Sequence, residues 1–213
     1  SDAQKKKDED GPSMDLYINM MVDATPDAQM KVIMDPVTGD HIAARGNGNL
    51  QVNYYNKGSF RMFGNYIIDQ GVYKLSMQEV IRKDFALQEG GTISFSGDPY
   101  HANLDLQAVY TVNSVSLSDL STDATLNKST VKVNCIMNLT GSLANPSINF
   151  DLDLPAVSEE DRELVRSATS TEEQMNTQII YLLTIGKFYT VDYGNNANRS
   201  SNATSSLAFN TLS

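Results

Sequence analysis

The feature that most constrains this chain is a two-residue alternation of apolar and polar side chains between residues 83 and 112. Phe85 and Leu87 fall on one side of an extended segment, and Ile93 and Phe95 fall on one side of the next. This period is typical of β-strands that bury one face and leave the other in water. A helix would need apolar residues every three or four positions, so the segment predicts strands.

Turn residues divide this segment into strands. Gly90-Gly91 lies between two alternating runs, which is typical of a turn that joins antiparallel strands. Gly97-Asp98-Pro99 marks a second break, after which a long strand is expected.

The same alternation recurs through residues 14–155 and predicts about ten short strands. Asp35 to Asp40 contains Pro and Gly in the order of a tight turn, and Gly46-Asn47-Gly48 predicts a bend or a bulge. Beyond Gly64 the alternation blurs, and it resumes at Val72. The chain is therefore expected to be mainly β.

Composition and period divide the chain into four segments. Residues 1–13 mix charges of both signs and are expected to be a disordered leader. The strands of 14–155 are followed by a helical period over 156–189 and by an Asn- and Ser-rich, flexible tail over 190–213. Both ends break off abruptly and no signal peptide is visible, so we expect a piece of a longer protein whose targeting signal lies elsewhere.

The helical segment carries recognisable start and stop signals. Thr171 and Gln174 have the spacing of a capping box, and Gly186 is a typical stop. One face of the intervening helix contains Met175, Ile179, Leu182 and Leu183. We expect this face to cap the open end of the sheet. The alternative is a surface helix that docks on a partner or a membrane, although few basic residues flank it.

Charge and reactive residues exclude several functions. The net charge of −10 argues against nucleic acid as a partner, because phosphate binding requires clustered Lys and Arg. Cys135, the lone cysteine, keeps the register of an apolar strand face and is expected to be a buried hydrophobe. His41 and His101 lie in separate turns, and Asp151 and Asp153 fall on the polar face of a strand. We therefore expect no enzyme, no cofactor and no metal site.

The apolar face of so many strands leaves three architectures open. The sheet can fold over as a sandwich, close as a barrel, or curl into an open trough. The face is rich in Leu, Ile, Val, Met and Phe, and the pattern assigns no charge to it. An acyl chain sheathed there would gain about 0.8 kcal/mol per CH₂, or on the order of 12 kcal/mol for sixteen carbons before ordering costs. A core filled by the chain itself is the competing possibility.

Three stretches of the sequence resemble the C-terminal domain of the TamB family, a subunit of the translocation and assembly module of Gram-negative bacteria. The first comprises residues 35–40 and 46–50, and the second runs from Gly71 to Ala108, including the segment around Gly90. The third is 141–155 followed by 178–186. The resemblance spans residues 33–188, and the Asn-rich tail suggests a Bacteroidetes-type member.

The resemblance implies a long curled, antiparallel-rich sheet that forms an open, β-taco-like trough, with one or two C-terminal helices. It further implies a periplasmic domain of a protein anchored in the inner membrane, which carries phospholipid or another acyl-chain ligand towards the outer membrane. The implied partner is an Omp85-type outer-membrane protein. A second hypothesis is a protein-interaction module that assists outer-membrane protein assembly by adding an edge strand to its partner.

Under the conduit hypothesis, the inward apolar residues line a lipid groove. These residues are Leu16, Ile18, Met20, Val32, Leu50, Val52, Phe60, Met62, Leu75, Met77, Phe85, Leu87, Ile93, Phe95, Leu104, Leu106, Ala108, Val131, Val133, Met137, Leu139, Ile148, Phe150 and Leu152.

Overall fold

The computed structural model of the chain describes residues 14–77, 81–121 and 130–190. The expected leader and all but the first residue of the expected tail lie outside these ranges. The strands are β1 (Tyr17–Ala24), β2 (Gln29–Ile33), β3 (His41–Tyr55), β4 (Phe60–Met77), β5 (Ile81–Leu87), β6 (Thr92–Gly97), β7 (Asn103–Ser116), β8 (Thr130–Ser142) and β9 (Asn145–Asp153). The helical elements are η1 (Pro99–His101), η2 (Leu117–Leu120), α1 (Glu159–Ala168) and α2 (Glu172–Ile185).

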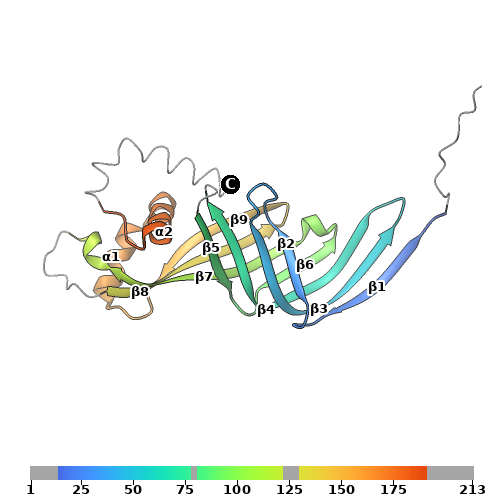
Figure 1. Cartoon of the computed structure of the whole chain (residues 1–213), viewed down its shortest axis with the longest axis horizontal. Coiled ribbons are helices and arrows are strands. Elements are labelled where there is room, and N and C mark those ends of the chain that lie inside the picture. The colour runs from blue at the N-terminus through green and yellow to red at the C-terminus, as the bar shows by residue number, and fades with distance from the viewer. Residues whose placement is uncertain (1–13, 78–80, 122–129, 191–213) are drawn as a thin grey trace, which may run out of the picture.

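The nine strands form one antiparallel sheet of order β1-β3-β4-β5-β7-β8-β9. Strand β2 pairs with β3 beyond the end of β1, and β6 pairs with β4 and β7 beyond the end of β5. The sheet is long and curved, with β1 at one end and the two helices at the other (Figure 1). The described strands β1 and β9 lie at opposite ends of the strand order and do not pair with each other, so the sheet is open. The expected curled trough with C-terminal helices is confirmed.

The expected hairpin around Gly90 is wrong. Strands β5 and β6 do not pair with each other but follow one another along β4, where Phe85 pairs with Tyr73 and Ile93 pairs with Tyr66. The connection is tied to β4, because the Gly90 amide donates to the Ile68 carbonyl at 2.8 Å and the Ile68 amide donates to the Gly91 carbonyl at 2.8 Å. A Gly-Gly dipeptide is a local signal, whereas the pairing was decided by β4, which is long enough to accept both strands.

The blurred alternation after Gly64 is explained by a bulge in a single continuous strand. The pairing of β3 with β4 passes from Gly46↔Ile68 to Arg45↔Gln70, which leaves one extra residue on β4. A bulge of this kind reverses the parity of the residues that follow it. The inward positions of β4 are consequently even-numbered up to Ile68 and odd-numbered from Gly71 onwards. The irregularity expected at 46–48 is therefore present. The alternation before Gly64 and after Val72 predicted two strands, but both segments belong to the single strand β4.

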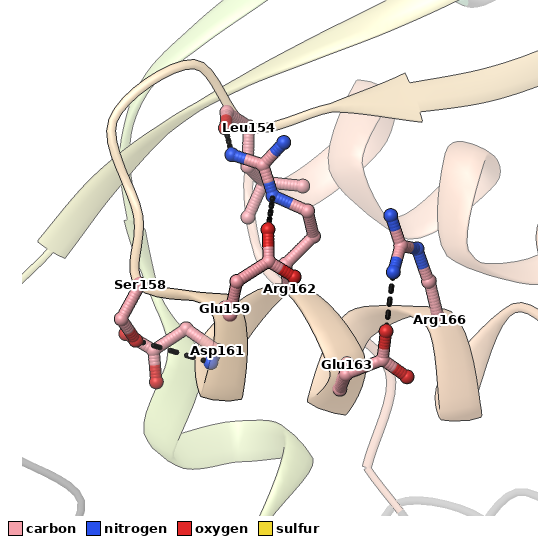
Figure 2. A network of polar contacts seen from close by, with 7 residues as sticks. All are labelled: Leu154, Ser158, Glu159, Asp161, Arg162, Glu163 and Arg166. Carbon is pink, nitrogen blue, oxygen red and sulfur yellow. Dashed lines mark hydrogen bonds and ion pairs between the residues drawn. The ribbon is translucent and has the colours of Figure 1, made fainter.

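Side-chain hydrogen bonds cap helix α1 and attach it to the end of the sheet. The hydroxyl of Ser158 accepts from the Asp161 amide at 3.2 Å and caps α1, while Arg162 donates to the carbonyl of Leu154 just beyond β9 at 3.2 Å (Figure 2). Arg162 also lies 3.9 Å from a carboxylate oxygen of Glu159, and an ion pair between Glu163 and Arg166 follows one turn later (Figure 2).

Helix α2 has the start and stop signals that the sequence predicts. The capping box of Thr171 with Gln174 is present, and Gly186 ends the helix in a left-handed conformation. The apolar face of α2 belongs to the same core as the strands, with Ile179, Leu182 and Leu183 buried and Met175 partly buried.

Candidate functional site

The candidate site is the concave face of the sheet, defined as the strand positions that share a side with the buried core. Cross-strand pairing makes this face continuous across neighbouring strands. Met20 of β1 lies opposite Val52 of β3, which in turn lies opposite Met62 of β4. Further along, Leu106 of β7 lies opposite Leu139 of β8. Residues far apart in the sequence thus form one apolar surface.

The structure places the residues expected to line a groove in three environments. Those that are buried are Leu50, Val52, Leu75, Phe85, Leu87, Ile93, Leu104, Leu106, Ala108, Val133, Met137 and Leu139. Those that are half-buried are Val32, Met62, Phe95, Val131, Ile148, Phe150 and Leu152. Those that are exposed are Leu16, Ile18, Met20 and Phe60. Met77 lies on β4, and its side chain falls outside the described part of the structure.

The middle of the concave face is filled by the chain's own side chains. Phe85 is 0% exposed, and its ring lies 5.7 Å from the ring of Tyr110 on β7 and 6.4 Å from the ring of Phe150 on β9, between centroids. Strands β7 and β8 separate β5 from β9 in the sheet order, so the Phe85–Phe150 contact joins opposite walls of the trough. The sheet therefore curls tightly enough there for its walls to meet.

The concave face is open at the β1 end. Six inward apolar side chains there are 37% to 50% exposed, and we call them the open end: Leu16, Ile18, Met20, Val22, Tyr54 and Phe60. Val22 and Tyr54 were not among the expected lining residues. The signal that could have found them is parity, because Val22 follows Met20 by two positions and Tyr54 follows Val52 by two. A contiguous exposed apolar surface of this kind marks a site for an apolar ligand or partner.

The two edges of the sheet differ in their protection against further pairing. Strand β1 has one acidic residue, Asp23, and no Lys or Pro, and its outward residues Tyr17 and Met21 are also exposed. Strand β9 carries Pro146 and Asp151 together with a second aspartate. Proline and charged residues block pairing at sheet edges, so β1 is the edge at which a further strand could add.

One charge on the concave face was missed by the sequence pattern. Lys83 on β5 lies opposite Leu75 of β4 and has the same parity as Phe85, so it is an inward residue. The sequence pattern does not identify it, because Lys83 stands at the start of the alternating segment. The expectation that no charge belongs to this face is therefore wrong.

Asp40, His41 and His101 have structural partners. The Asp40 carboxylate accepts from the Ser76 amide at 2.9 Å, and burial raises its pKa above the ordinary value. His41 contacts the Gly39 carbonyl, and His101 contacts Asp98. Within the described ranges, no three His, Cys, Asp or Glu residues are grouped as a metal site would require.

None of the described helices is long and apolar enough to cross a membrane.

Cys135 provides a test of whether the middle of the face is closed. It is 0% exposed, as expected, and burial raises the pKa of its thiol to about 12. At about pH 8 an ordinary thiol is partly thiolate, so we expect Cys135 to react with iodoacetamide about a thousandfold more slowly than a free cysteine. Labelling followed by mass spectrometry, with the chain unfolded in urea as the positive control, measures this rate. Rapid labelling of the folded chain would show that the walls separate readily.

A family model described as the TamB C-terminal domain matches residues 1–213 of the chain. No curated protein matches it.

Proposed function

Because the chain belongs to the TamB C-terminal domain family, and so to the translocation and assembly module, we propose that its concave face binds and conducts phospholipid. The domain is non-enzymatic and periplasmic, and it is part of an envelope-spanning protein anchored in the inner membrane. It delivers lipid towards the outer membrane together with an Omp85-type partner. The Asn- and Ser-rich composition after residue 190 supports a Bacteroidetes-type member.

The observation that carries this proposal is the open end. Its inward side chains offer apolar surface that water still contacts, so an acyl chain laid against them gains the free energy of removing that surface from water. The outward positions of the sheet are mainly polar, such as Asn53 and Arg61, and would remain solvated. An acyl chain would therefore be held on one side of the sheet.

Passage of lipid beyond the open end requires the walls of the trough to separate. The contact between Phe85 and Phe150 occupies the concave face between β5 and β9. Both rings belong to strands joined through only two others, so an outward movement of β9 would uncover the face without breaking the pairing of β1 to β5. Binding at the open end and conduction through the middle are thus separate steps.

A second candidate function is supported by the β1 edge. An exposed strand with unpaired backbone groups and little charge is suited to pairing with a strand of an outer-membrane protein. In this mode the backbone of β1 provides the affinity, and the inward and outward side chains of β1 contribute equally to the contact.

Two neighbouring methionines on β1 separate these functions. Met20 faces inward and is 49% exposed, whereas Met21 faces outward and is 66% exposed. We expect native mass spectrometry of the chain purified from cells to recover bound phospholipid. Met20→Asp should lower the lipid-bound fraction at least about tenfold, because a carboxylate on the apolar face is costly to desolvate. Met21→Asp should leave it unchanged.

The control for folding is circular dichroism of both variants. A clean mass without lipid for the unaltered chain would contradict the lipid proposal. If no lipid is recovered, and Met20→Asp and Met21→Asp weaken binding to an outer-membrane protein equally, the edge-strand function is favoured.

A further inference from the structure

Lys83 is the only charged residue on the concave face among the strand residues that the structure describes. The other charged residues of the neighbouring strands, including Lys74, Arg82 and Asp84, fall on the outward parity. Lys83 lies opposite Leu75, which is buried, and precedes the fully buried Phe85 by two positions. A half-buried lysine therefore lies beside the filled part of an apolar face.

The ammonium group of Lys83 has a neutral partner. Its Nζ lies 3.4 Å from the Tyr110 hydroxyl oxygen and 5.4 Å from the centroid of the Tyr110 ring. In the described part of the chain, no carboxylate forms an ion pair with it. Lys74 on the opposite side of the sheet shows the ordinary arrangement, an exposed ion pair with Asp84 at 3.6 Å.

The contacts leave capacity for an anion. An ammonium group has three donors, and the Tyr110 contact uses one of them. The Tyr110 hydroxyl can accept from Lys83 while donating its own proton to another acceptor. Lys83 and Tyr110 are both half-buried. The pair thus lies near the border between apolar face and water.

We propose that Lys83 and the Tyr110 hydroxyl bind the anionic head group of an amphiphile, a phosphate ester or a carboxylate, whose alkyl chain lies on the concave face between the walls of the trough when they separate. The inference rests on the proposed function, because it assigns a head-group position to the same apolar face. A hydrogen bond from the ammonium group to an anion is stronger than its contact with the neutral hydroxyl of Tyr110, because both partners are then charged. The site therefore selects anionic amphiphiles over neutral ones with the same chain.

The experiment compares dodecyl phosphate with dodecanol by calorimetric titration of the complete chain, below the micelle-forming concentration. We expect dodecyl phosphate to bind at least about tenfold more tightly, the preference given by one or two charge-assisted hydrogen bonds. Lys83→Met keeps an unbranched side chain only one heavy atom shorter, and it should abolish the preference while dodecanol binds as before. Tyr110→Phe should reduce the preference partially. Lys132→Met, on the exposed outward face of β8, is the matched control and should retain it.

Each outcome decides the inference. Equal binding of both amphiphiles, or a preference that survives Lys83→Met, would overturn the head-group site and leave the apolar groove intact. Binding of inorganic phosphate alone with similar affinity would show an anion site unrelated to the alkyl chain. If neither amphiphile binds, the proposed lipid function fails together with the inference.

Discussion

Replacing Phe85 with Ala is expected to lower the free energy of unfolding by about 3–5 kcal/mol, as measured for large aromatic residues removed from packed cores. The ring is 0% exposed and contacts both Tyr110 and Phe150, so its removal leaves a cavity between two walls of the trough. Urea unfolding followed by circular dichroism measures the loss. The expected change is large because the walls cannot collapse freely around the missing ring.

Phe60→Ala is the matched control, since Phe60 is on the same face at the open end and is 45% exposed. Its loss should cost less than about 1.5 kcal/mol, because about half of the ring is already in water. Similar losses for the two variants would contradict a face that is filled in the middle and open at the β1 end.

Gly64→Ala is expected to destabilise the chain by about 3 kcal/mol or more, or to prevent folding, because it combines backbone strain with a clash. Gly64 has φ of 122°, a conformation that residues with a side chain rarely adopt, and an added Cβ would lie 2.5 Å from the Asn49 carbonyl oxygen. The obstacle is backbone of the neighbouring strand β3, which cannot move without loss of the β3–β4 pairing. Thermal and urea unfolding of the purified variant measure the effect.

Gly39→Ala separates the two causes. Gly39 also has positive φ, at 81°, but an added Cβ would meet nothing within 4 Å. This variant should show the strain alone, about 1–2 kcal/mol. Equal destabilisation by the two substitutions would indicate that close approach of β3 and β4 at Gly64 is unimportant.

The expected fold class follows from local patterns that the structure retains. Alternation predicts a strand wherever one face is buried, and β7 and β8 have the predicted alternation. The capping residues of α2 act within a few positions of themselves, so Thr171 and Gly186 could be identified from sequence. The burial of Cys135 was predictable for the same reason, because its neighbours on the strand were apolar at every second position.

Pairing was less accessible to sequence reasoning. Gly90-Gly91 resembled a hairpin turn, yet the strands on either side of it pair with β4. A bulge on β4 moved the inward parity from Ile68 to Gly71 and hid the continuity of an 18-residue strand. Both errors arise because a strand's partner depends on the length and register of a distant segment.

Local patterns in the sequence were enough to predict strands with one apolar face, one or two helices after them, and a face that avoids most charges. The folded sheet was needed to show which part of the face is filled, which part is open, and that Lys83 belongs to the face. The physical reason is that alternation records the side of the sheet on which a residue lies, while exposure depends on curvature. Curvature brings Phe85 against Phe150 and leaves Met20 in water, although the two-residue period marks all three residues alike.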